Sequence, residues 1–202
     1  MIENATDFTE RKKALRDEAH ARRNAQVEKD EISRTIVASF MALPEYAAAK
    51  TVMFYVDVRS EVRTRNDLAT ALAADKRIVV PYCVEGELEL FHLENMEELV
   101  VGMYKILEPR PDLRSLASKR VAVESLDLIL VPGVAFDRRG ARMGHGKGYY
   151  DKLLEHARCD TPLVALAFEC QMFPEIPMAE HDIFMDKIVT EAGVFAGQGR
   201  KS

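Results

Sequence analysis

The sequence predicts one α/β domain with three layers, in which helices cover both faces of a mixed, mostly parallel sheet. Strand-length runs of apolar and β-branched residues alternate with helical segments along most of the chain, a pattern typical of parallel strands joined by helices. A length of 202 residues with 48% hydrophobic content suits one substantial core better than two. Residues 86–93 alternate charged and apolar side chains after a glycine, which predicts a half-exposed antiparallel strand at the sheet edge.

Two helices are expected before the first strand. The segment 9–26 contains neither glycine nor proline, and Thr9 suits the N-cap position. Apolar residues then recur with helical spacing from Ile32 to Phe40, so that their side chains share one face of a second helix. That helix should end before Pro44, because proline lacks the N–H that a helix interior requires.

The remaining elements follow from apolar runs of strand length. A short helix around Leu68 and Leu72 joins the first two strands in a βαβ unit, and a helix is expected over 148–157 after a glycine-rich loop. Ligands of such folds bind beyond the carboxyl ends of the strands. Buried strands are expected at 51–58, 77–82, 126–132, 163–168 and 187–191.

The charge balance and the apolar pattern exclude several classes of function. The chain has 33 acidic and 28 basic side chains, a net charge of -5, so it has no overall positive field to attract a nucleic-acid backbone. It has no apolar run of about 18 residues and no apolar signal segment at its start. We therefore expect a cytoplasmic protein, a monomer or weak homo-oligomer, that binds neither nucleic acid nor membrane.

The domain boundaries follow from the same patterns. Residues 1–8 precede the first predicted helix and form an N-terminal extension, and residues 9–195 contain all the predicted elements. The last residues, 196–202, are polar and rich in glycine, and we expect them to form a disordered tail.

The glycine-rich segment 133–151 is the most informative part of the chain. Gly144, Gly146 and Gly148 occupy alternate positions, so the backbone can approach a ligand closely and its N–H groups can converge on phosphate oxygens. Arg142 and Lys147 add positive charge, and a helix that begins near Gly148 adds its N-terminal partial charge. From glycine spacing alone, a flexible surface turn with incidental charges explains the segment equally well.

This segment is not a Walker A loop. Five residues rather than four separate Gly140 from Gly146, and Gly148 stands where a serine or threonine would hold magnesium. Tyr149, Tyr150 and Asp151 follow directly. Flat aromatic rings beside a phosphate cradle are what a combined pterin and nucleotide site requires. Asp151 is a candidate magnesium ligand, although a carboxylate in the first turn of a helix also simply stabilises that helix.

The segment resembles the signature loop of the 5-formyltetrahydrofolate cyclo-ligase family, written GxRxGxGxGYYD from Gly140 to Asp151. Near the amino terminus, Lys12-Lys13-Ala14-Leu15-Arg16 resembles that family's K-x-x-L-R element. The residues around Glu61, the EP pair at Glu108 and the carboxyl-terminal region also resemble the family, so that the likeness runs from about Lys12 to Glu191. The chain departs from the commonest form of the loop at His145 and Lys147, where many members have an aromatic residue and a glycine.

The resemblance implies an activity. Members of the family spend ATP to close 5-formyltetrahydrofolate to 5,10-methenyltetrahydrofolate, with release of ADP and phosphate, through a phosphorylated formyl group (an iminium phosphate). It implies catalytic roles for Arg142 and Lys147, and a magnesium ion held by Asp151 together with Asp182, or with Asp186 as the alternative. Magnesium commonly binds one or two carboxylates together with phosphate oxygens.

The resemblance also implies two sets of binding residues. The implied ATP-binding residues are Lys12, Lys13, Ala14, Leu15, Arg16, Arg142, Met143, Gly144, His145, Gly146, Lys147, Gly148, Tyr149 and Tyr150. The implied folate-binding residues are Val56, Glu61, His145, Gly146, Lys147, Gly148 and Tyr149. From the residues alone, Lys12 and Arg16 are also consistent with solvated helix charges, Glu61 with a surface carboxylate, and Val56 with the strand core.

Two other functions are compatible with the predicted architecture. A sugar-phosphate isomerase would use the basic loop to hold a sugar phosphate and would need no ATP. A catalytically silent relative would bind nucleotide or RNA as a regulatory module, although the complete loop and the acidic net charge argue against it.

Overall fold

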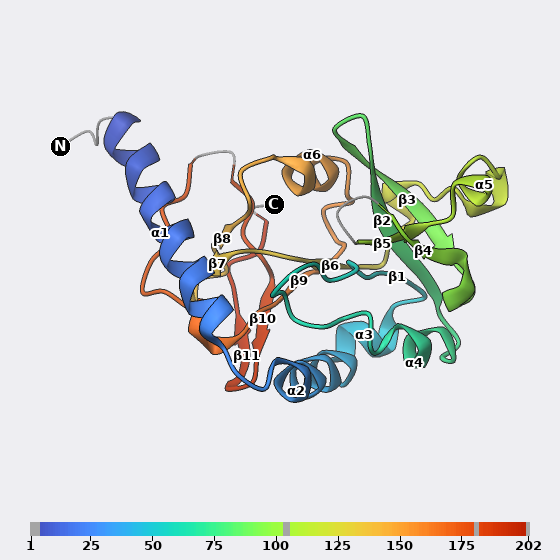
Figure 1. Cartoon of the computed structure of the whole chain (residues 1–202), viewed down its shortest axis with the longest axis horizontal. Helices are drawn as coiled ribbons and strands as arrows, with labels where there is room; N and C mark the ends of the chain where they lie inside the picture. Colours follow the sequence, from blue (N-terminus) through green and yellow to red (C-terminus); the bar gives the residue numbers. More distant parts are fainter. Residues whose placement is uncertain (1–4, 103–105, 180–181, 201–202) are drawn as a thin grey trace.

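A seven-stranded mixed sheet forms the centre of the molecule (Figure 1). The computed structural model describes residues 5–102, 106–179 and 182–200. The strand order is β11-β10-β9-β6-β1-β2-β3; the inner strands pair in parallel, and antiparallel strands close both edges. These strands are β1 (Thr51–Met53), β2 (Arg77–Val84), β3 (Glu87–Leu93), β6 (Leu128–Val131), β9 (Leu163–Leu166), β10 (Lys187–Thr190) and β11 (Gly193–Ala196).

Helices cover both faces of the sheet, which confirms the predicted three-layer α/β fold. One face carries α2 (Lys29–Met41), α3 (Pro44–Ala48) and α4 (Leu68–Leu72); the other carries α6 (Tyr149–Glu155) (Figure 1). Side chains of buried strands alternate between the faces: Leu128 and Leu130 belong to the core under α2, whereas Ile129 belongs to the core under α6. This alternation explains why the central strands read as continuous apolar runs.

The longest helix, α1 (Ala5–Ala25), lies at one end of the molecule, where it packs beside the small hairpin of β7 (Ala135–Phe136) and β8 (Arg142–Met143) (Figure 1). It docks through few apolar side chains, chiefly Leu15 and Ala19. The buried guanidinium of Arg23 also holds it in place, by donating to Ser60 Oγ (3.0 Å) and to the carbonyl of Gly133 (3.2 Å). Thr9 is not the N-cap, because the described helix already includes residues 5–8.

Shorter elements complete the chain. A second hairpin pairs β4 (Leu99–Val101) with β5 (Leu107–Pro109), which we did not predict because three-residue strands have too little pattern. The other short helices are α5 (Pro111–Arg114) and the 3₁₀ turns Met96–Glu98, Ala117–Lys119, Val123–Ser125 and Glu169–Gln171.

Both predicted ends of the domain need correction. Residues 5–8 of the expected extension belong to α1, while 1–4 lie outside the described residues. The expected tail at 196–202 is held against the domain as far as it is described, through 200: Gly197 N–H donates to Asp186 O (2.8 Å), and Arg200 donates to carbonyls of Ala157 and Thr161. The missed edge strand β11 explains why this segment is ordered.

The strand predicted over 51–58 ends at Met53. The N–H of Phe54 still donates to the carbonyl of Val79 in β2 (2.9 Å), but beyond it side chains take over. The Thr64 hydroxyl donates to the carbonyl of Tyr55, and Glu61 Oε2 accepts the N–H of Val58 (3.0 Å). Such side-chain bonds compete with sheet pairing. They turn the chain into a loop at the carboxyl end of β1, where the fold is expected to hold its ligand.

Candidate active site

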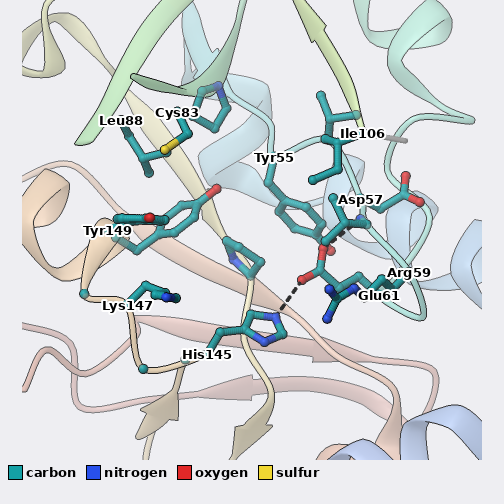
Figure 2. A pocket seen from close by; sticks show the side chains of 18 of the residues that line it. Tyr55, Asp57, Arg59, Glu61, Cys83, Leu88, Ile106, His145, Lys147 and Tyr149 are labelled. Atoms are coloured by element: carbon teal, nitrogen blue, oxygen red, sulfur yellow. Dashed lines mark hydrogen bonds and ion pairs between the residues drawn. The ribbon is translucent and has the colours of Figure 1, made fainter. Parts of the chain in front are cut away.

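One cavity of about 670 Å³ opens beyond the carboxyl ends of β1, β2 and β6 (Figure 2). Its volume lies within the range of small-molecule sites. Its walls come chiefly from the loop after β1, the β2–β3 hairpin, the glycine loop before α6 and one face of α1, with further residues at 106–108, Pro132 and Asp182. Figure 2 shows Tyr149, Leu88 and Cys83 on one side of the cavity, and Tyr55, Ile106 and Glu61 on the other.

The loop after β1 contributes a buried carboxylate, Glu61. Its Oε2 accepts the N–H of Val58 (3.0 Å), and its Oε1 lies 3.4 Å from Nε2 of His145 (Figure 2). The neighbouring Asp57 is also buried; burial raises its pKa, against the N–H of Arg65 and the charges of Arg65 and Arg63. Asp57 thus shapes the loop through its bond to Arg65, whereas Glu61 also turns an oxygen toward His145 in the cavity.

Tyrosine rings form much of the cavity wall. Burial raises the pKa of Tyr55 and of Tyr150, and the negative charge of Glu61 adds to both shifts. Burial, together with the hydroxyl's bond to Glu89, raises the pKa of Tyr82 to about 12. All three phenols therefore stay neutral at physiological pH and offer flat faces to an aromatic ligand. The hydroxyls of Tyr55 and Tyr82 donate within the protein, to Val62 O and to Glu89.

The glycine loop has the backbone conformation expected of a phosphate-binding segment. Gly146 and Gly148 have φ angles of 85° and 71°, which other residues rarely adopt. The loop ends where α6 begins at Tyr149, as predicted. Gly140 is required for a different reason: a Cβ there would lie 2.4 Å from the carbonyl oxygen of Met185.

Arg142 lies at the base of this loop with only 6% of its side chain exposed. Its Nη1 donates to the carbonyl of Pro132 (3.2 Å) and its Nη2 to Asp151, while its Nε is buried and has no hydrogen-bond partner among the residues that the structure describes. Burial lowers its pKa, and the charges of Asp151 and Asp182 act against that shift. An arginine keeps its charge under such conditions, so Arg142 is a buried cation whose Nε–H can still donate to a ligand.

Helix α1 presents two cations to the cavity, Lys12 and Arg16, which are one turn apart as predicted. Arg16 Nε donates to the carbonyl of Gly144 (3.1 Å), and Lys12 Nζ bonds Asp182 Oδ2 (2.9 Å). The other residues of this element, Lys13, Ala14 and Leu15, do not line the cavity. The first two are exposed, and Leu15 packs on the apolar cluster under α1.

Two of the three candidate metal ligands lie at the cavity. Asp151 and Asp182 both line it, each beside a cation, Arg142 and Lys12 respectively. Asp186 does not line it: its Oδ2 accepts the N–H of Leu163 (2.7 Å) and ties β10 to β9. Within 5–102, 106–179 and 182–200, no three His, Cys, Asp or Glu side chains form a metal site. Two carboxylates still suit magnesium when phosphate oxygens complete its ligands.

The structure brings the remaining predicted residues together from distant segments. Val56, Met143, Gly144, His145 and Lys147 all line the cavity. Figure 2 shows Lys147 beside Tyr149 on the side opposite Glu61. The basic groups and the aromatic groups thus share one cavity rather than two.

Several lining residues were missed by the sequence analysis. Most of them lie at a strand's carboxyl end or in the loop that follows, which is a weak signal by itself. The hairpin residues Cys83 and Leu88 become part of the wall only because β2 and β3 extend past the rest of the sheet. The missed lining residues are Tyr55, Asp57, Val58, Arg59, Arg65, Pro81, Tyr82, Cys83, Leu88, Ile106, Leu107, Glu108 and Pro132.

A search for membrane-spanning elements found, within the described residues, no helix long and apolar enough to cross a bilayer.

Comparison with known proteins identifies the family. The family model of the 5-formyltetrahydrofolate cyclo-ligases matches residues 8–191. A probable 5-formyltetrahydrofolate cyclo-ligase of Schizosaccharomyces pombe is 33% identical over 175 residues, covering 80% of this chain and 84% of that protein. The 5-formyltetrahydrofolate cyclo-ligase of Escherichia coli K12 is 29% identical over 172 residues, covering 83% and 92%. The solved structure of Aquifex aeolicus 5,10-methenyltetrahydrofolate synthetase superimposes with a TM-score of 0.80 at 33% identity, covering 95% of each chain. This chain therefore belongs to the 5-formyltetrahydrofolate cyclo-ligase family of enzymes.

Proposed function

We propose that this protein uses ATP to convert 5-formyltetrahydrofolate to 5,10-methenyltetrahydrofolate, ADP and phosphate. The observation that carries the proposal is the single cavity that joins a cationic glycine loop to a wall of tyrosines around a buried glutamate. A triphosphate requires the first part, and a reduced pterin with several N–H donors suits the second. The family membership supports the same reaction.

The reaction has two steps. The formyl oxygen on N5 attacks the γ-phosphorus, so that an O–P bond forms as the bond to the β-phosphate oxygen breaks and ADP leaves. N10 then attacks the formyl carbon; a C–N bond forms, the C–O bond breaks, phosphate leaves and N10 loses its proton. Both steps need positioning and charge neutralisation more than a protein nucleophile.

The residues of the cavity suit these tasks. Arg142 and Lys147 would neutralise charge on the migrating phosphoryl group, the first through its buried guanidinium with an unpartnered Nε. Lys12 and Arg16 would hold the nucleotide phosphates from α1. Glu61 would accept a hydrogen bond from the pterin. The backbone N–H groups of the glycine loop would bind phosphate oxygens.

Asp151 and Asp182 would hold a magnesium ion together with the phosphate oxygens of ATP, since both carboxylates line the cavity. When bound, the ion would neutralise phosphate charge. The two acids would then exchange their contacts with Arg142 and Lys12 for the ion, which leaves both cations available to the phosphates.

The test is direct. Purified protein is mixed with ATP, magnesium and 5-formyltetrahydrofolate, and the absorbance of the methenyl product is followed together with ADP release in equal amount. Omission of ATP, and separately chelation of magnesium, should each abolish product formation. Product formation without ATP would contradict the proposed mechanism, and no product under any of these conditions would overturn the proposed function. A sugar-phosphate isomerase or a silent nucleotide-binding relative would give no methenyl absorbance.

A further inference from the structure

Three distant parts of the chain meet at one edge of the cavity through His20, His145 and Glu61. His20 belongs to α1, His145 to the glycine loop and Glu61 to the loop after β1. The two imidazole rings stack with their centroids 5.3 Å apart and their planes at 30°. On its other side, His145 places Nε2 3.4 Å from Glu61 Oε1 (Figure 2). The sequence separation of these residues means that only the tertiary fold creates this arrangement.

The two oxygens of Glu61 are in different situations. Oε2 accepts a hydrogen bond of ordinary length, 3.0 Å, from the N–H of Val58. The contact of Oε1 with His145 is longer, at 3.4 Å, and a hydrogen bond of that length is weak. The side chain of Glu61 is nevertheless only 7% exposed. Oε1 is therefore a buried acceptor that a ligand donor can engage more strongly than the protein does.

Protonation is disfavoured on one ring of the stack. Burial lowers the pKa of His20, and the charges of Arg23 and His145 lower it further; Asp17 acts in the opposite direction, and Arg59 adds a smaller lowering effect. The other ring, His145, is the one whose Nε2 faces Glu61.

The charged groups around the stack come from α1 and from the loop after β1. From α1, Asp17 and Arg23 face the stack, and Arg16 lies against the glycine loop beside Gly146. From the loop after β1, Arg59 faces it alongside Glu61. A protonated His145 would therefore meet Glu61 as its acceptor, and the bond between them would be charge-assisted on both sides.

We propose that the His20–His145 stack is a positioning device that makes the binding of the reduced folate by Glu61 dependent on pH; the proposal rests on the function proposed above. With His145 neutral, Oε1 of Glu61 accepts from the pterin. With His145 protonated, the imidazolium donates to Oε1 and competes with the substrate. His20 holds the ring of His145 in place for both states, although it touches neither substrate.

The first test is the KM for 5-formyltetrahydrofolate at saturating ATP between about pH 5 and 8, where an imidazole titrates. In the native protein this KM should rise about tenfold toward the acid end. The loss of one hydrogen bond to a charged group costs about as much free energy as a tenfold loss of affinity. In His145→Gln, which keeps an uncharged donor, the KM should lose this step. His156→Gln is the matched control, because His156 is exposed and lies outside the cavity; it should behave as the native protein does.

The second test separates positioning from mere structural support. His20→Ala removes the stacking partner, and should raise the KM for the folate and weaken its dependence on pH, with little change in kcat or in the KM for ATP. His20→Phe restores a flat ring and should recover the native pH profile, because stacking rather than a proton on His20 is what the device requires.

Each outcome has a defined meaning. A native KM for the folate that does not change with pH, or a step that persists in His145→Gln, overturns this proposal and leaves the proposed function intact. The same holds if His145→Gln abolishes a pH dependence of the KM for ATP instead, because His145 would then act on the nucleotide. Absence of the methenyl product at every pH overturns the proposed function and this proposal with it. Should His20→Ala fail to fold, His145→Gln decides alone.

Discussion

Two buried regions of the molecule use the same chemical groups in opposite ways: the turn between β7 and β8, and the cavity wall. In the turn, Asp137 is fully buried and both of its oxygens are saturated. Oδ1 accepts the N–H groups of Arg139 (2.9 Å) and Ala141 (3.2 Å), and Oδ2 accepts those of Ile176 (2.9 Å) and of the Arg139 guanidinium (2.8 Å). In the cavity, Glu61 is nearly as buried, but one oxygen has only a long contact.

The arginines of the two regions differ in the same way, although they are only three residues apart. Arg139 uses its guanidinium on Asp137, on Glu175 and on the carbonyl of Ile176. Arg142 is far more buried, yet its Nε has no partner. A buried donor without a partner costs free energy, so a group left in that state is a candidate for binding a ligand. Between these two regions, unused hydrogen-bonding capacity, more than burial, is what differs.

The largest expected effect tests the saturated side of this comparison. Asp137→Ala leaves three N–H groups and a guanidinium without their acceptor, and should lower the free energy of unfolding by about 3–5 kcal/mol. Urea denaturation measures the loss. As a control, Asp112→Ala removes an exposed partner of Arg110 and should leave stability unchanged. A small effect of Asp137→Ala would mean that water replaces the carboxylate.

Arg142→Lys tests the unsaturated side. Lysine keeps the charge but loses the planar fork, so kcat should fall about a hundredfold, the usual loss for a transition-state donor. The control is Arg139→Lys, which should lower stability but leave kcat per folded molecule unchanged. Equal kcat losses in the two variants would contradict the distinction drawn here.

Glu61→Gln changes the buried carboxylate of the cavity. Glutamine still offers an oxygen to the N–H of Val58, so we expect little change in stability. The KM for 5-formyltetrahydrofolate should rise about tenfold, because a charge-assisted bond becomes a neutral one. The KM for ATP should stay the same; a parallel rise in both would place Glu61 in the scaffold rather than at the folate.

The smallest expected effect concerns a carboxylate at the opposite end of the sheet. Burial alone would raise the pKa of Asp127, but the N–H groups of Thr51 and Lys50 and the charge of Arg158 outweigh it and lower that pKa. A lowered folded-state pKa gives stability above the unfolded pKa of about 3.9, lost as the pH falls through the folded value. Asp127→Asn should therefore cost about 1 kcal/mol at neutral pH, reduced by solvent screening. The difference from the native protein should shrink as the pH falls below the unfolded pKa and vanish below the lowered folded-state pKa.

The secondary structure was largely predictable because its causes are local. Apolar runs marked the central strands, and the alternating run at 86–93 correctly predicted the antiparallel strand β3 (Glu87–Leu93). The predictions failed where side chains from elsewhere decide the backbone. The strand expected over 51–58 stops at Met53, and the side chains of Thr64 and Glu61 bond the backbone of Tyr55 and Val58 beyond it; no pattern within the strand predicts this.

The site was predictable in part for the same reason. The spacing of the glycines and tyrosines between Gly140 and Asp151 is a local pattern. Because this pattern resembles the signature loop of the 5-formyltetrahydrofolate cyclo-ligases, the sequence predicted the family that the family model confirms. The helical periodicity placed Lys12 and Arg16 on one face, but only packing shows that this face meets the cavity while Lys13 faces solvent.

By itself, then, the sequence determined the layered fold, the glycine loop and the family, because each depends on residues close together in the chain. Only the tertiary structure decided that Asp182 rather than Asp186 reaches the cavity, and that His20 stacks on His145 against Glu61. These arrangements depend on how helix α1 and the carboxyl-terminal segment pack on the sheet, and contacts between such distant segments leave no periodic trace in the sequence.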